Sequence, residues 1–253
     1  MELPKNRFKR AIAEGQLQIG LWSQLANPYA TEVLADAGFD FVVVDAEHAP
    51  NDVLSVAPQL QILDRSPASA VVRPPWNDMV LIKRYLDVGA QTLLVPYVQS
   101  AEEAALAVSY LRYPPAGLRG VAGCHRGNRF GRVEDYFAQA VSELCLVVQV
   151  ETVDALDRLE AIAAVEGVDG IFIGPADLAA SMGQIGNLDH PDVRAAIEAV
   201  PTRLQGLGKP AGILSSLEAD VRRHIEAGFL FVAVGSDLAL LAKQTAALAA
   251  RYR

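Results

Sequence analysis

The sequence has few of the residues that build disulfide-rich or thiolate-metal proteins. Two cysteines, Cys124 and Cys145, occur in 253 residues, and there is no Cys-x-x-Cys pair. Neither a disulfide scaffold nor a thiolate zinc site is therefore indicated. No apolar run reaches the ~18 residues that span a membrane, and the N-terminal segment lacks the apolar core of a signal peptide. We expect a cytoplasmic protein.

Positive charge is also scarce. The chain has 22 lysine and arginine residues against 30 aspartate and glutamate residues, a formal net charge of −8. Nucleic acids and anionic membranes are bound by basic faces, so neither is an expected partner, although a local basic site is not excluded. With 51% hydrophobic residues, the chain is too apolar to be disordered. Its length suits one large core, as in α/β barrels.

Short apolar segments recur along the whole chain. They are rich in Val and Ile and do not alternate with polar residues, which is typical of strands buried on both faces of a parallel sheet. The segments are Gln18–Trp22, Phe41–Asp45, Ala70–Arg73, Thr92–Pro96, Leu146–Glu151, Gly170–Gly174, Pro210–Leu214 and Phe231–Gly235. Most precede a segment of helical spacing, such as Pro28–Gly38, Asn77–Gly89 and Leu217–Gly228. This order predicts a (β/α)₈ TIM barrel, with residues 1–253 forming a single domain.

An open, doubly wound sheet is the alternative architecture. The even distribution of eight segments favours closure, and no Gly-x-Gly-x-x-Gly motif follows the first one, which weakens a dinucleotide-binding fold. The last segment, Asp237–Arg253, is rich in Ala and Leu and is predicted to be helical. It would either cap the barrel or pack on another subunit.

Carboxylates follow two of the predicted strands at the end where barrel enzymes place catalytic groups. Glu151 ends the fifth predicted strand, and Asp177 comes shortly after the sixth. Two converging carboxylates repel unless a cation or proton lies between them. Their hard oxygens suit Mg²⁺ or Mn²⁺, with waters or substrate in the other positions. The alternative is that both are ordinary carboxylates paired with arginines.

A histidine and an arginine close two other predicted strands. His48 directly follows the second strand, and an imidazole titrates near neutrality, as a general base should. Asp45 and Glu47 precede it and are candidates to orient it or to hold metal-bound water. Arg73 ends the third strand, where its guanidinium would bind a carboxylate or a developing enolate. A structural role for His48 and a plain salt bridge for Arg73 remain open, and patterning alone gives Asp87 no role.

The positions of the basic residues separate two chemistries. None of the five lysines lies at the carboxyl end of a predicted strand, so a Schiff-base mechanism is not expected.

One basic cluster, Leu118–Arg132, contains four arginines and His125, and its glycines mark it as a loop. We expect His125 and Arg126 to lie over the site and hold an anionic substrate; the alternative is that they make a subunit contact or lie in a solvated loop.

Several motifs together identify a family resemblance. They are GFDFVVVDAEHAPND (38–52), VVRPPWND (71–78), RYPPAGLRGV (112–121), VQVET (148–152), EGVDGIFIGPADLAASMG (166–183) and LFVAVGSDLALL (230–241). On these motifs the chain resembles the metal-dependent class II pyruvate aldolases of the HpcH/HpaI family over nearly its full length. The stretch HRGNRFGRVEDYFAQ (125–139) looks closest to the branch that cleaves 2-keto-3-deoxyglucarate. The resemblance implies a barrel that assembles as a trimer-based homohexamer with an exchanged C-terminal helix.

The resemblance also implies roles for individual residues. Glu151 and Asp177 would hold a divalent metal, with Mg²⁺, Mn²⁺ and Co²⁺ as the candidates. His48 would be the proton acceptor, and Arg73 would stabilise the enolate. Asp87 would reach across a subunit interface and raise the basicity of the histidine.

Substrate contacts are implied in the same way. Gln149 and the main chain at Ala176 would contact the keto acid, together with Arg73 and Asp177. One departure from the family pattern is Ala46, where glycine is usual between the two acids. The added methyl group removes no chemical function.

The expected activity is reversible aldol cleavage and addition. Pyruvate or hydroxypyruvate would supply the enolate, an aldehyde would accept it, and the cleaved compounds would be hydroxylated 2-keto acids such as 2-keto-3-deoxyglucarate or 4-hydroxy-2-oxo acids. One alternative is a coenzyme A thioester lyase of the malyl or citramalyl type on the same barrel. Another is a non-catalytic keto-acid-binding protein.

Overall fold

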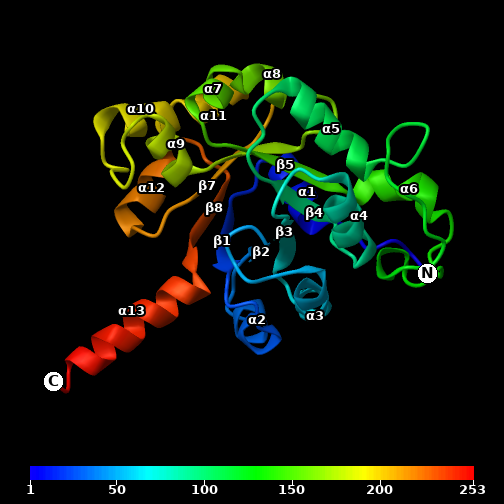
Figure 1. The fold of residues 1–253 in the computed structure, drawn as a ribbon, viewed down its shortest axis with the longest axis horizontal. Coiled ribbons are helices and arrows are strands. Elements are labelled where there is room, and N and C mark those ends of the chain that lie inside the picture. The colour runs from blue at the N-terminus through cyan, green and yellow to red at the C-terminus, as the bar shows by residue number, and fades with distance from the viewer.

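The computed structural model describes residues 1–253, and its eight strands close into a barrel in chain order. All neighbouring strands are parallel, and the last pairs with the first (Figure 1). The strands are β1 (Gln18–Ser23), β2 (Phe41–Asp45), β3 (Ser69–Arg73), β4 (Thr92–Val95), β5 (Cys145–Val150), β6 (Gly170–Ile173), β7 (Ala211–Leu214) and β8 (Phe231–Ser236). The predicted (β/α)₈ barrel is therefore confirmed.

Helices α2 to α12 connect successive strands around the outside of the barrel, whereas α1 precedes the first strand and α13 follows the last (Figure 1). They are α1 (Arg7–Ala13), α2 (Pro28–Ala35), α3 (Val53–Leu63), α4 (Met79–Asp87), α5 (Ala101–Leu111), α6 (Tyr136–Glu143), α7 (Val153–Asp157), α8 (Leu159–Ala163), α9 (Pro175–Ser181), α10 (Pro191–Glu198), α11 (Val200–Gln205), α12 (Glu218–Glu226) and α13 (Asp237–Ala250). A short 3₁₀ helix, Arg126–Asn128, interrupts the long connection between α5 and α6. No helix combines the length and the apolarity needed to cross a lipid bilayer.

Strand β2 shows why the apolar segments do not alternate with polar residues. Val42 and Val44 belong to the large core between the strands and the surrounding helices. Phe41 and Val43 belong to a second apolar cluster inside the barrel. Because successive side chains of a strand point to opposite faces, both faces of β2 need apolar residues.

Helix α1 closes the amino-terminal end of the barrel. Its Phe8 and Ile12 join the interior cluster. The ring of Phe8 lies 5.2 Å from that of Phe41 and 5.6 Å from that of Phe231, centre to centre. Because α1 closes the amino-terminal end, the carboxyl end of the barrel is the end that can accommodate polar side chains.

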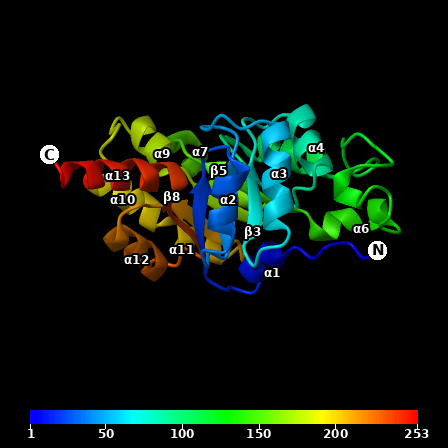
Figure 2. The ribbon, with the colours of Figure 1, turned by 90° about the horizontal axis from the view of Figure 1, so that it is seen from below.

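Helix α13 extends away from the barrel, as Figures 1 and 2 show from two directions. Its first residue, Asp237, is its only buried one and accepts hydrogen bonds from the N–H groups of Gln24 (2.7 Å) and Leu25 (3.3 Å). Its exposed leucines are Leu238, Leu240, Leu241 and Leu248. The predicted helix is confirmed, but the expectation that it caps the barrel of its own chain is wrong.

Candidate active site

Polar side chains gather where four strands end. Asp45 and Arg73 close β2 and β3 and stand opposite each other in the register of this pair. Glu151 follows β5 directly, and Asp177 lies in the first turn of α9, after β6. Since parallel strands present their carboxyl ends at the same rim, these groups share one end of the barrel.

Arg73 contacts both acids at the end of β2, Asp45 and Glu47. Its Nε and Nη2 donate to the two carboxylate oxygens of Asp45 at 2.9 and 2.7 Å, and its Nη1 lies 2.7 Å from Oε2 of Glu47. Burial opposes the ionisation of Asp45, but the hydrogen bonds and the charge of Arg73 outweigh it and lower the pKa of Asp45. The guanidinium also lies 5.4 Å from the ring centre of Trp22. Arg73 is therefore held in one place by contacts on several sides.

Asp45 shapes the turn that carries Glu47 and His48. Its Oδ1 accepts the main-chain N–H groups of Glu47 at 3.0 Å and of His48 at 3.3 Å, and its Oδ2 accepts a hydrogen bond from Gln24. The imidazole of His48 is 63% exposed, and its Nε2 lies 3.9 Å from Oε1 of Glu47. Asp45 thus positions the main chain of His48, whereas Glu47 is the acid beside its ring.

Glu151 is a buried carboxylate with no positive partner. Its Oε1 accepts the main-chain N–H of Tyr97 at 2.8 Å, and its Oε2 accepts a hydrogen bond from the side-chain amide of Gln149. Burial, together with the negative charges of Glu47 and Asp177, raises the pKa of Glu151 to about 7. Burial likewise raises the pKa of Glu47 to about 7, although Arg73 opposes the shift. Three carboxylates therefore repel one another at this rim.

These residues fit a divalent cation. The donors are hard oxygens, and Oε1 of Gln149 is buried without a hydrogen-bond partner. A β-carbon on Gly174 would stand 2.3 Å from Oε2 of Glu151, so this glycine leaves the space that the carboxylate occupies. No three His, Cys, Asp or Glu side chains form a closed metal cage. Glu151 and Asp177 would leave positions for water and for a chelating substrate, as Mg²⁺ and Mn²⁺ sites commonly do.

The residues expected to contact the keto acid lie beside this group. Gln149 is buried at the end of β5, next to Glu151. Ala176 is exposed near the start of α9, directly before Asp177. Ala46 is buried at the end of β2, between the two acids that Arg73 joins.

Asp87 lies at the opposite end of the barrel from His48 of the same chain. It is the last residue of α4, which runs back to the start of β4. Its Oδ1 accepts a hydrogen bond of 2.9 Å from Arg119 and lies 4.0 Å from Nδ1 of His125. His125 is buried, and this burial lowers its pKa.

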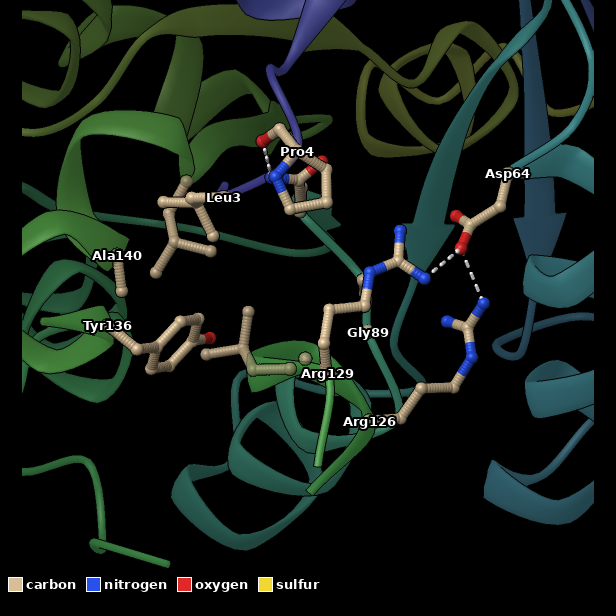
Figure 3. Close-up of a pocket in the computed structure, with 13 residues that line it drawn as sticks. Leu3, Pro4, Asp64, Gly89, Arg126, Arg129, Tyr136 and Ala140 are labelled. Atoms are coloured by element: carbon tan, nitrogen blue, oxygen red, sulfur yellow. Dashed lines mark hydrogen bonds and ion pairs between the residues drawn. The ribbon is translucent and has the colours of Figure 1, made fainter. Parts of the chain in front are cut away.

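The basic loop also lies at that opposite end, where Arg126 and Arg129 line a pocket together with Leu3 and Pro4 of the N-terminal segment (Figure 3). Arg126 donates to Asp64, which follows α3, at 2.6 Å and to the carbonyl of Val88, which follows α4, at 2.8 Å. Arg129 lies 3.3 Å from the same carboxylate oxygen of Asp64. Within one chain, His125 and Arg126 therefore do not lie over the rim that carries Glu151, because the loop follows α5, a helix that returns to the amino-terminal end. The order of the elements was the available sequence signal, because a loop that follows a strand and then a helix lies at the amino-terminal end of the barrel.

Two contributors to the site escaped the sequence reasoning. Trp22 lies at the end of β1, and this position at the functional rim was a usable signal for its contact with Arg73. Tyr97 contributes its main-chain N–H to Glu151. No residue type marks a main-chain donor, and the backbone of Tyr97 has a positive φ of 55° that its sequence does not suggest.

Comparisons with known proteins agree with this geometry. The family model of HpcH/HpaI aldolase/citrate lyase matches residues 18–244. The chain is 59% identical to a pyruvate aldolase of Rhizobium etli, over 100% of this chain and 99% of the relative. It is 53% identical to a 5-keto-4-deoxy-D-glucarate aldolase of Klebsiella pneumoniae, over 98% and 97% of the two chains.

A solved structure matches the barrel closely. It is a family protein from Burkholderia cenocepacia, with a TM-score of 0.94 and 39% identity, and the match covers 98% of this chain and all of the other. The family match spans all eight strands and includes Glu151 and Asp177. We conclude that the chain belongs to the HpcH/HpaI aldolase/citrate lyase family.

Proposed function

We propose that the chain is a single-domain, divalent-metal-dependent aldolase, a carbon–carbon lyase that cleaves and forms hydroxylated 2-keto acids. The observation that carries this proposal is Glu151, buried beside two other carboxylates and lacking a positive partner. Such a carboxylate suits a cation, and a cation beside a keto acid is the basis of enolate chemistry. Glu151 and Asp177 would hold Mg²⁺, Mn²⁺ or Co²⁺.

The chain's own residues would then handle the proton and the negative charge. When bound, the metal would polarise the keto group and so acidify the adjacent C–H bond. His48, whose ring is exposed at the rim, would accept that proton. Arg73 is fixed by Asp45 and Glu47 and would stabilise the enolate oxygen. Gln149 and the main chain at Ala176 would orient the keto acid.

The names of the relatives suggest the substrate class. Their names specify pyruvate and 5-keto-4-deoxy-D-glucarate. Breaking the bond between C3 and C4 of the latter places the electron pair on C4, so C4–C6 become pyruvate after protonation. The C3 hydroxyl loses its proton and becomes the aldehyde of a three-carbon hydroxy acid. We propose such six-carbon keto diacids as substrates, with pyruvate or hydroxypyruvate as the donor in the synthetic direction.

The assembly would complete the site. Asp87 lies too far along the barrel to reach His48 of its own chain, so a neighbouring subunit would have to bring the two together. Helix α13 exposes four leucines and would bury them against another subunit. We propose a homohexamer built from trimers, in which α13 is exchanged and the basic loop forms subunit contacts.

Metal-stripped protein provides the test. Wild-type protein resupplied with Mn²⁺ should exchange the methyl protons of pyruvate in D₂O and should cleave the keto diacid. The double variant with Glu151→Ala and Asp177→Ala should do neither. Full activity of the stripped double variant would reject the metal assignment. Binding of pyruvate without proton exchange would indicate a non-catalytic protein, and cleavage of malyl thioesters alone would indicate the coenzyme A lyase.

A further inference from the structure

Two exposed aromatic side chains stack on each other near Glu151. Trp76 lies in the connection that follows β3, and Tyr97 lies in the connection that follows β4. Their ring centres are 5.5 Å apart, and their planes differ by 28°. Trp76 is 53% exposed and Tyr97 is 42% exposed, so the pair is not part of the apolar core.

The backbone of Tyr97 is in a conformation that a tyrosine rarely adopts. Its φ is 55°, in the left-handed region, where a β-carbon is unfavourable. In this conformation its N–H donates to Oε1 of Glu151 at 2.8 Å. The next N–H, that of Val98, donates to the main-chain carbonyl of Gln149 at 3.1 Å. The turn at Tyr97 is thus bonded directly to the strand end that carries Glu151.

We infer that Trp76 and Tyr97 are positioning residues for Glu151. The stack holds Tyr97 in the left-handed conformation, and the N–H of Tyr97 then fixes one oxygen of Glu151 while Gln149 fixes the other. The inference rests on the proposed role of Glu151 as a metal ligand. It assigns an effect on metal affinity to two side chains that bear no ligand atom.

The position of Trp76 gives the stack a second consequence. Trp76 follows Arg73 by three residues, with Pro74 and Pro75 between them. The two prolines restrict the backbone between the guanidinium and the indole. The stack therefore joins the connection that follows Arg73 to the turn that holds Glu151, so the cationic and anionic halves of the site are set relative to each other.

Direct Mn²⁺ binding to metal-stripped protein, measured by electron paramagnetic resonance without substrate, tests the inference. Trp76→Ala and Tyr97→Ala should bind Mn²⁺ about twofold to tenfold more weakly, as expected when one aromatic pair is lost. Tyr97→Phe keeps the stack and should bind like the wild type. Tyr97→Gly loses the stack but tolerates a positive φ, so its affinity should lie between those of Tyr97→Ala and the wild type.

Tyr29→Ala serves as the matched control, because Tyr29 is 78% exposed and is not part of the Trp76–Tyr97 stack. Wild-type affinity in both Trp76→Ala and Tyr97→Ala would overturn the inference, and so would weaker binding by Tyr97→Gly than by Tyr97→Ala. If an alanine variant fails to fold, Trp76→Phe should bind more tightly than Trp76→Leu, and equal affinities would overturn the inference. Glu151→Ala separates the two proposals. If it binds Mn²⁺ like the wild type, the proposed metal site itself fails.

Discussion

Replacing Arg73 with lysine tests how the site holds its charges. Arg73 makes three contacts with carboxylates, two to Asp45 and one to Glu47. A lysine keeps the positive charge but has a single ammonium group, so it cannot reproduce the planar fork between two acids. Asp45 has no exposed surface and would remain buried with fewer partners.

The magnitude follows from these contacts. A hydrogen bond to a charged group contributes about 1.5–3 kcal/mol, so losing both of those that Arg73 donates to Asp45 would cost about 3–6 kcal/mol. Disrupting a buried ion pair typically costs about 3–5 kcal/mol, which is the loss we expect in the free energy of unfolding. The enolate would lose an oriented donor as well, which corresponds to a reduction in kcat of about 10²–10³-fold.

Two assays measure these effects at one protein concentration, since the proposed assembly would make the apparent stability depend on concentration. Urea unfolding gives the stability, and exchange of the pyruvate methyl protons in D₂O gives the rate. Arg222→Lys is the control, because Arg222 is 72% exposed and pairs with an equally exposed Glu218. A pair this exposed to water contributes little to stability. If Arg73→Lys unfolds and exchanges like Arg222→Lys, the ion network has no role in holding the site.

Two further substitutions test the space around Glu151 and the anchoring of the N-terminal segment. Gly174→Ala would place a β-carbon 2.3 Å from Oε2 of Glu151, so Mn²⁺ binding should be lost, whereas Gly206→Ala meets no atom within 4 Å and should bind normally. Equal affinities would refute the steric argument. Glu143 is buried and bonded to Arg10, Lys5 and the N–H of Asn6. Burial opposes its ionisation, but these partners outweigh it and lower its pKa below the ordinary value of 4.5. Its stabilising effect is therefore complete above pH 4.5 and is lost as the pH falls through the lowered pKa. The difference in unfolding free energy between wild type and Glu143→Gln should shrink in acid, and a constant difference would contradict this reasoning.

The strands were predictable because each is buried on both faces. Phe41–Asp45 was predicted with its observed bounds, since its inward and outward side chains are all apolar until Asp45. Helix ends followed from local chemistry in the same way. The segment Asn77–Gly89 was predicted as helical, and α4 begins within it, where Asp78 caps the helix by accepting the N–H groups of Val80 and Leu81.

The site was predictable only where its residues follow strands directly. Glu151 and Arg73 were found because their side chains end buried segments at one rim. The placement of Arg126 depends on its contacts with Asp64 and Val88, which are distant in sequence. The main-chain donor at Tyr97 depends on a backbone angle rather than on a residue type. The order of strand, helix and loop could have indicated the end of the barrel at which Arg126 lies, but its contacts and the donor at Tyr97 could not be read from local patterns.

The closure of the barrel by Phe8 has a consequence for how substrates enter and products leave. With α1 across one end and aromatic rings filling the interior, the barrel has a single mouth. A keto acid held at Glu151 and Gln149 would sit at the bottom of that mouth, with the aldehyde above it. In the cleavage direction the aldehyde would therefore have to depart before pyruvate, and in the synthetic direction pyruvate would have to enter first. On this placement of the two substrates, the architecture would impose an order of binding and release on the proposed reaction.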